Sequence, residues 1–165
     1  MNEPQKAVPV GASAIIPRLF CRNPADEVEF CVSAFHAEER VRRPAPDGTL
    51  GHALITIGPA MVMIEGEWPE APNRAPSRDG STAVALYVYV ENVDETLERA
   101  LSHGARLLMA AANQPWGDRI AWFLDPAGHV WTVATRVEET TEQQRDERLG
   151  SLLDKSTSHQ SSRRA

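Results

Sequence analysis

The chain has 165 residues, of which 42% are hydrophobic and 24% charged, and this size suits a single domain or two small fused modules. The 23 acidic residues outnumber the 17 basic ones and give a net charge of −6, which disfavours nucleic acid as a partner. The longest stretch without Asp, Glu, Lys or Arg, residues 48–64, contains Gly and Pro and is shorter than the ~20 apolar residues of a membrane span. We therefore expect no contact with a membrane.

The chain has two cysteines, Cys21 and Cys31. Residues 1–11 lack the basic and apolar regions of a secretion signal. We therefore expect reduced thiols and a cytoplasmic protein. Residues 1–12 and 155–165 have no apolar periodicity, so both ends are predicted to be disordered.

The first half of the chain predicts a strand over 14–21, a helix, and three further strands over 41–43, 52–57 and 60–65. The helix begins after Asn23-Pro24, an N-cap followed by proline at the first helical position, and ends at His36. Its spacing predicts one buried face and one face in water. The predicted buried face comprises Val28, Cys31, Val32 and Phe35. The predicted solvent-exposed face includes Glu27, Glu29 and Ser33.

The same order of elements returns after a proline-rich linker, residues 67–81. A strand over 83–90 precedes a helix that Asn92 and Glu95 cap and that ends at His103, with Leu97, Ala100 and Leu101 on its buried face. Strands over 106–110, 120–124 and 130–135 follow. Equivalent helix ends lie about 67–69 residues apart, which indicates an internal duplication of a βαβββ module, residues 13–66 and 82–137.

The segment after the second module, residues 138–154, predicts a C-terminal helix because Thr140 or Thr141 can cap it and Arg148, Leu152 and Leu153 lie toward one side. A frayed surface segment is the alternative.

Several short segments resemble the glyoxalase/bleomycin resistance protein/dioxygenase superfamily, also called the vicinal oxygen chelate superfamily, and within it the PhnB-like branch. They are residues 51–58, which begin Gly-His-Ala, the run Trp-Gly-Asp-Arg at 116–119, and Asp-Pro-Ala-Gly-His-Val-Trp at 125–131. The resemblance covers residues 14–137. It implies an α+β fold of two tandem βαβββ modules whose mixed sheets form a half-open barrel covered by helices on its outer face, and it implies a homodimer.

The resemblance also implies a site for a divalent metal, held in the superfamily by four His or Glu side chains. By residue order the four places fall at Ile16, Glu65, Ala85 and Thr132. Only Glu65 is a strong ligand, because Ile and Ala carry no donor atom and a threonine hydroxyl is a poor one. We therefore predict no metal and no other cofactor, with a divalent metal as the alternative.

A hairpin that turns at Gly58-Pro59 pairs His52 with Glu65 and Leu54 with Met63. A carboxylate beside an imidazole orients its ring, so Glu65 and His52 are the candidate catalytic acid/base pair. The alternative is that His52 caps its strand in solvent while Glu65 binds the adjacent loop.

Strand alternation predicts a cavity wall on which the residues of both modules face inward. Arg18 suits a carboxylate or phosphonate, and the tyrosines offer stacking area and a hydroxyl. We expect Trp116 to cover the mouth of the cavity from its loop. For Phe20 and Tyr89, packing in the core is the simpler alternative to a role in ligand binding. The predicted ligand-binding residues are Arg18, Phe20, Met63, Tyr87, Tyr89 and Trp116.

Other polar and aromatic residues have structural interpretations. His129 and Trp131 alternate with Thr132, so we expect His129 to be a turn or interface residue and the Trp131 ring to pack beneath a helix. Asp118 and Arg119 predict a loop clamp, and His36 and His103 stabilise helix ends.

The sequence thus predicts a protein that binds a small aromatic or drug-like molecule in a cavity without the superfamily's metal site. The alternative is a metal-dependent lyase, isomerase or dioxygenase of the same superfamily. The expected partners are a small-molecule ligand and a second copy of the chain, and the sequence leaves open whether a reaction is catalysed.

Overall fold

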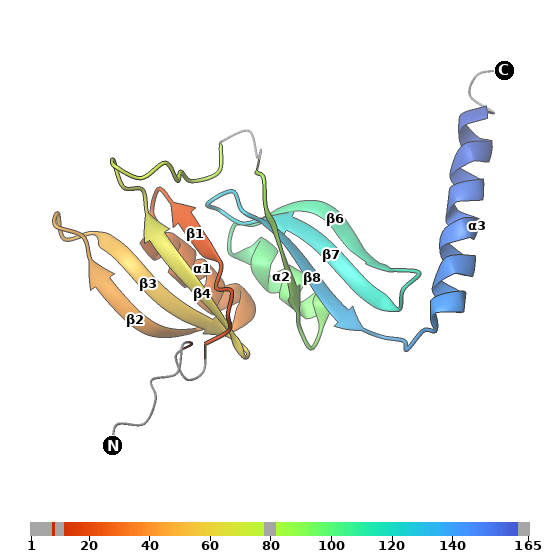
Figure 1. Cartoon of the computed structure of the whole chain (residues 1–165), viewed down its shortest axis with the longest axis horizontal. Coiled ribbons are helices and arrows are strands. Elements are labelled where there is room, and N and C mark those ends of the chain that lie inside the picture. Colours follow the sequence, from red (N-terminus) through yellow and green to blue (C-terminus); the bar gives the residue numbers. More distant parts are fainter. Residues whose placement is uncertain (1–7, 9–11, 78–81, 162–165) are drawn as a thin grey trace.

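The computed structural model describes residues 8, 12–77 and 82–161, and it contains two modules followed by a helix (Figure 1). The sequence predicts disorder at both ends and a loop in the linker. Part of each prediction lies outside the described residues, namely at 1–7, 9–11, 78–81 and 162–165. The first module comprises β1 (Arg18–Cys21), α1 (Pro24–Phe35), β2 (Glu38–Pro44), β3 (Leu50–Ile57) and β4 (Ala60–Gly66). The second comprises β5 (Ala85–Tyr89), α2 (Val93–Ser102), β6 (Arg106–Asn113), β7 (Asp118–Leu124) and β8 (Val130–Arg136).

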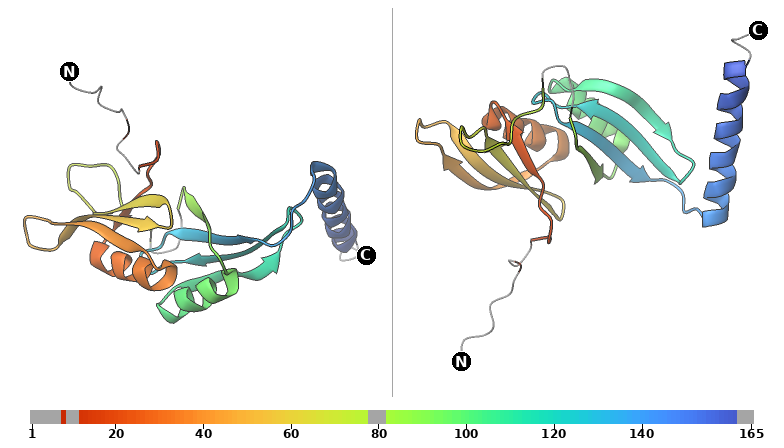
Figure 2. Two further views of the ribbon diagram at one scale, coloured as in Figure 1. Left: turned by 90° about the horizontal axis from the view of Figure 1, so that it is seen from below. Right: turned by 45° about the horizontal axis from the view of Figure 1, so that its top comes forward.

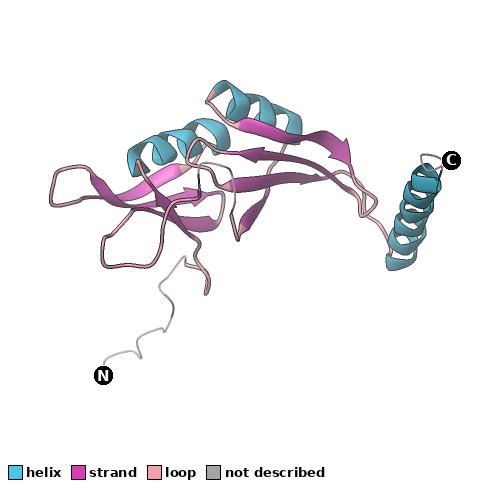
Figure 3. Cartoon of the chain, turned by 90° about the horizontal axis from the view of Figure 1, so that it is seen from above, coloured by secondary structure: helices cyan, strands magenta, loops and turns pink. Residues whose placement is uncertain are grey.

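Each module folds its strands into one four-stranded mixed sheet, and the two sheets have the same strand order. The orders are β1-β4-β3-β2 and β5-β8-β7-β6, with the first two strands of each sheet parallel and the other neighbours antiparallel. This topology confirms the two βαβββ modules. The sheets stand side by side without closing into a barrel, and α1 and α2 cover the same side of both, which leaves the opposite side free of helices (Figures 2 and 3).

The two helices begin at asparagines in different ways. Asn92 Oδ1 accepts hydrogen bonds from the backbone N–H groups of Asp94 and Glu95, at 3.0 and 3.2 Å, as the predicted cap requires. Asn23 occupies the equivalent position, but its side chain makes no capping hydrogen bond. Helix α1 ends at His36, which adopts the left-handed conformation with φ of 56° and, like His103 after α2, confirms the predicted helix end.

The predicted faces of α1 are partly wrong, because Glu27 is only 1% exposed whereas Val32 is 41% exposed. The physical reason is that α1 packs against its own sheet and also against the second module. The rings of Phe30 and Phe35 contact Phe123 of β7, and the centroids of Phe35 and Trp131 lie 4.6 Å apart. A helix buried on two sides has a wider apolar surface than the single stripe that periodicity describes. One core therefore joins both modules.

The C-terminal helix α3 (Glu142–Ser161) begins later than Thr140 and continues through residues 155–161, where the sequence predicts disorder. It packs against no other helix or strand of the described chain and projects away from the second sheet (Figure 1). The guanidinium of Arg148, in the first half of α3, forms an ion pair with Glu138 at 2.7 Å and so links the helix to the segment before it. None of the helices in the described ranges is long and apolar enough to cross a bilayer.

Candidate functional site

The helix-free side of the first sheet carries a charged group around Glu65. Strand pairing places His52 opposite Glu65 on the neighbouring strand, which confirms the predicted register. The imidazole Nδ1 of His52 lies 3.2 Å from Glu65 Oε1, and Arg18 donates to the same oxygen from Nε at 3.1 Å and from Nη2 at 3.0 Å. The carboxylate is buried while the guanidinium is half exposed, so Arg18 can both neutralise Glu65 and face a ligand.

Phe20 completes this group by holding the guanidinium in place. The guanidinium carbon of Arg18 lies 5.3 Å from the centre of the Phe20 ring, within the range of a cation–π contact. The ring itself is buried, whereas Met63, which pairs with Arg18 across the parallel strands, is half-buried on the same face. The first sheet therefore presents one cation beside an apolar surface.

The helix-free side of the second sheet is organised by Asp118, a carboxylate that is 1% exposed. Its Oδ2 accepts hydrogen bonds from the hydroxyls of Tyr87 and Tyr89 at 3.1 and 3.0 Å and from the indole Nε1 of Trp116 at 3.1 Å. Its Oδ1 accepts from Nε of Arg136 at 2.6 Å. Four donors from three segments, namely β5, the loop before β7, and β8, thus converge on one buried side chain.

These hydrogen bonds set the ionisation of the Asp118 group. Burial alone would raise the pKa of Asp118, but hydrogen bonds from Arg136, Tyr89 and Tyr87 outweigh it and hold the pKa below its ordinary range. Burial, with Asp118 alongside, raises the pKa of Tyr87 to about 12. At neutral pH Asp118 is therefore an anion and Tyr87 a neutral hydroxyl.

The predicted clamp between Asp118 and Arg119 is wrong. Successive residues of a strand point to opposite faces, so Arg119 turns away and pairs with Asp94 at 2.7 Å, while Arg136 from β8 pairs with Asp118. The sequence analysis did not single out Arg136 and named Asp118 only as the partner of Arg119. Strand alternation places Asp118, Tyr87 and Tyr89 on the same face of the sheet as Thr132. The sequence does not show this, because it depends on the register between strands that are far apart in the chain.

The structure arranges the predicted ligand-binding residues in two groups. Arg18, Phe20 and Met63 lie with Glu65 and His52 on the first sheet, and Tyr87, Tyr89 and Trp116 surround Asp118 on the second. Alternate residues of these strands, such as Ile64 and Val133, belong to the core beneath the helices, so both groups face the side of the sheets that Figure 2 shows without helices. Within the described chain, no hydrogen bond, ion pair or ring contact joins one group to the other, so a single cavity wall stays a prediction.

The expected metal-ligand places need correction for two of the four residues. Ile16 precedes β1, and the residue beside Glu65 in the strand pairing is Phe20; likewise Tyr87, not Ala85, lies beside Thr132. A phenylalanine ring has no donor atom, and Tyr87 is held by Asp118. Among the residues that the structure describes, no three His, Cys, Asp or Glu side chains lie close enough to hold an ion. At the four places that strand pairing gives, a divalent metal would therefore find only one strong ligand, Glu65, so these residues do not fit the metal site of the superfamily.

Comparison with protein families decides the assignment of the chain. Residues 15–133 match the model of the Glyoxalase/Bleomycin resistance protein/Dioxygenase superfamily. The chain belongs to this superfamily. Uncharacterised proteins of Mycobacterium bovis and Mycobacterium tuberculosis are each 36% identical over 129 residues, which span 76% of this chain and 85% and 76% of the relatives.

Several solved structures show the same fold. TioX from Micromonospora sp. ML1 superposes with a TM-score of 0.61 at 28% identity, covering 76% of this chain and 99% of TioX. A PhnB protein from Bacillus cereus gives 0.58 at 20% identity, covering 74% and 99%. FosX from Listeria monocytogenes, solved with Mn(II) and a dihydroxypropylphosphonic acid, gives 0.58 at 18% identity, covering 83% and 97%.

Proposed function

We propose that this member of the glyoxalase/bleomycin resistance superfamily, of its PhnB-like branch, binds a small aromatic or drug-like molecule bearing an acidic group, without a metal. The ligand lies on the helix-free side of the sheets. The observation that carries the proposal is that this side carries both a half-exposed guanidinium, Arg18 on the first sheet, and exposed aromatic rings, Tyr87 and Tyr89 on the second.

The chemistry of the two groups supports this kind of ligand. Arg18 forms an ion pair with Glu65, and the exposed edge of its guanidinium has further N–H donors for a carboxylate or phosphonate. Tyr87 is 50% exposed and Tyr89 58% exposed, although both hydroxyls are fixed by Asp118. Rings whose hydroxyls are held in place stack on a planar ligand with little further loss of conformational freedom.

The protein acts as a cytoplasmic homodimer in this proposal. Cys21 and Cys31 are free and buried, which suits a reducing compartment. The second copy is the one that the resemblance to the superfamily implies, and in this proposal it leaves the rings of Tyr87 and Tyr89 open to the ligand. The proposal includes neither nucleic acid nor a membrane as a partner, since acidic residues outnumber basic ones in a chain of net charge −6.

The test is a screen of aromatic acids and peptide-like antibiotics by quenching of tryptophan fluorescence. Wild-type protein is compared with the variants Arg18→Ala and Tyr87→Ala, and with Arg119→Ala as a matched control whose guanidinium faces the other side of its sheet. We expect Arg18→Ala to weaken binding of a hit about tenfold or more, because a charge-assisted hydrogen bond contributes roughly 1.5–3 kcal/mol. Tyr87→Ala removes a stacking surface, and we expect it to weaken binding severalfold, because an aromatic pair contributes about 0.5–1.5 kcal/mol. Binding that is equal in all four proteins would refute the assignment.

Elemental analysis of the purified protein separates the proposal from a metal-dependent lyase, isomerase or dioxygenase. We expect no transition metal at one equivalent per chain. One tightly bound Zn, Ni, Mn or Fe that is lost in Glu65→Ala would instead support the enzyme, with His52 and Glu65 as half of a metal site or as its acid/base pair.

A further inference from the structure

Arg43 is the charged side chain of β2 that has no partner in the described chain. The other four charged residues of this strand form two ion pairs, between Glu38 and Arg40 at 2.6 Å and between Glu39 and Arg42 at 2.6 Å. Arg43 is exposed, so the N–H donors of its guanidinium are free. The strand therefore carries one guanidinium whose charge is not balanced by its own neighbours.

Strand pairing places Arg43 beside the Glu65 group. Arg43 lies directly opposite His52 in the pairing of β2 with β3, and His52 lies opposite Glu65 in the pairing of β3 with β4. Residues opposite each other in an antiparallel pair share one face of the sheet, with Cβ atoms about 4.5–5.5 Å apart. Arg43, His52 and Glu65 therefore form one row, and the Cα atoms at its two ends are about 10 Å apart.

The preceding residue of β2, Arg42, shows that this row faces the helix-free side. Arg42 pairs with Ala53, which is 0% exposed and belongs to the core beneath the helices. Successive residues of a strand point to opposite faces, so Arg42 lies on the helix side and Arg43 on the helix-free side. The two arginines are thus alike in charge, strand and exposure, but only Arg43 shares a face with Glu65.

The charge balance of the Glu65 group shows what Arg43 adds to it. Arg18 donates to Glu65 Oε1, so the charges of this guanidinium and this carboxylate cancel. The exposed edge of Arg18 has further donors, but the pair as a whole is neutral and attracts an anion only weakly. With Arg43 and a neutral His52, the group carries one positive charge in excess.

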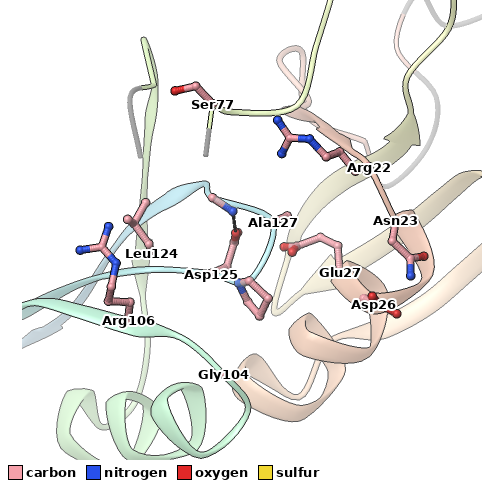
Figure 4. Close-up of a pocket in the computed structure, with 12 residues that line it drawn as sticks. Arg22, Asn23, Asp26, Glu27, Ser77, Gly104, Arg106, Leu124, Asp125 and Ala127 are labelled. Atoms are coloured by element: carbon pink, nitrogen blue, oxygen red, sulfur yellow. Dashed lines mark hydrogen bonds between the residues drawn. The ribbon is translucent and has the colours of Figure 1, made fainter. Parts of the chain in front are cut away.

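A cavity of about 450 Å³ at the junction of the two modules also brings two arginines together (Figure 4). Its lining includes Arg22 and Arg106, and Asp26 and Asp125 match them in number. Glu27 lies there too. Burial, together with the charge of Asp125 and a hydrogen bond to it, raises the pKa of Glu27, which therefore holds a proton. The cavity has no excess of positive charge, so an acidic ligand is expected at the first sheet instead.

We propose that Arg43 is a specificity-determining residue, which makes the group around Glu65 prefer an aromatic acid to the neutral amide of the same shape. The acid group lies over His52, between the guanidiniums of Arg18 and Arg43, and accepts hydrogen bonds from both. A carboxylate has two oxygens that accept from separate donors, which suits this position. The inference rests on the proposed function and adds to it the residue that supplies the unbalanced charge.

The experiment is an NMR titration of the full chain with cinnamate and with cinnamamide, an aromatic acid and its neutral counterpart. We expect wild type to bind cinnamate at least about fivefold more tightly, because only the acid gains charge-assisted hydrogen bonds. Chemical-shift changes should appear on β2 and β3 and not around the cavity of Figure 4. Added salt should reduce the preference for cinnamate, because exposed charges are screened.

The decisive variant is Arg43→Gln, which removes the charge of an exposed side chain that has no partner to lose. Arg42→Gln, on the opposite face of the same strand, is its control. We expect Arg43→Gln to bind the two probes with nearly equal affinity, Arg43→Lys to keep most of the preference, and Arg42→Gln to match wild type. Affinity for cinnamamide should change less than about twofold in all three variants.

The outcomes separate this inference from the proposed function. If Arg43→Gln prefers cinnamate as wild type does while Arg18→Ala loses the preference, the inference is overturned and the proposed function stands. An equal loss in Arg43→Gln and Arg42→Gln would show a general effect of net charge and would also overturn it. If wild type binds neither probe or shows no preference, the inference is overturned, and the screen of acids described above then decides the proposed function.

Discussion

Asp118 shows how one buried side chain can organise a binding surface. Its two oxygens fix the hydroxyls of Tyr87 and Tyr89, the indole of Trp116 and the guanidinium of Arg136, and so determine where the aromatic rings lie. Asp118 is a positioning residue in the proposed function, since it acts on a ligand only through its neighbours.

Substitution of Asp118 tests this interpretation. Asp118→Ala leaves three neutral donors and one cation without their acceptor, and we expect the free energy of unfolding to fall by roughly 1–3 kcal/mol in urea denaturation. Asp94→Ala, which removes the exposed partner of Arg119, is the control and should lower the free energy of unfolding clearly less, because an ion pair in water contributes little. Equal losses in the two variants would contradict the role of Asp118.

Glu27 makes stability depend on pH in the opposite sense to an ordinary paired carboxylate. Its pKa is raised in the folded chain, so the folded state keeps a proton that the unfolded state loses above about pH 4.3. The contribution of this group to the free energy of unfolding therefore declines as the pH rises from there toward the folded pKa. We expect Glu27→Gln to raise the melting temperature relative to wild type at pH 8 and to do so much less at pH 4.5. Glu29→Gln should follow wild type at both pH values, and a parallel shift of Glu27→Gln at both would argue against a protonated Glu27.

The helices show where local sequence rules hold and where they stop. Asn92 and Asn23 stand at equivalent helix starts, yet only Asn92 bonds the free N–H groups of the first turn. Pattern alone treats the two asparagines alike. The distinction depends on side-chain rotamers, which the surrounding structure selects.

The pair of caps gives a test at this scale. Asn92→Ala should lower the free energy of unfolding by about 1 kcal/mol, because two backbone donors lose their acceptor. Asn23→Ala should cost clearly less, since no capping bond is lost. Chemical denaturation of both variants measures the difference, and a larger effect at Asn23 would show that the cap assignment is reversed.

Across the whole molecule, the aromatic cluster of α1 and the second sheet makes the two modules one folding unit. The Phe35 ring of the first module packs against the rings of Trp131 and Phe123 of the second. Modules that share a core are expected to unfold together, despite their duplicated sequence pattern.

Phe35→Ala tests this coupling. We expect a loss of about 3–5 kcal/mol in stability, as for a buried aromatic side chain removed from a core. Tryptophan fluorescence, which reports mainly on the second module, and far-ultraviolet circular dichroism, which reports on both, should show coincident transitions. Val32→Ala, on the exposed face of the same helix, should stay within about 0.5 kcal/mol of wild type. Two separate transitions in wild type would show that the modules are independent.

The order of elements, the two-module repeat, the helix ends and the pairing of His52 with Glu65 followed from the sequence alone. These features depend on interactions between near neighbours: periodicity, turn residues and a hairpin whose length sets its register. The burial of Glu27, the exposure of Val32, and the hydrogen bonds from Tyr87, Trp116 and Arg136 to Asp118 were decided only by the tertiary structure. The physical reason is that a residue's burial and its polar partners depend on which distant surfaces pack against it, and α1 meets a second module that its own periodicity does not encode.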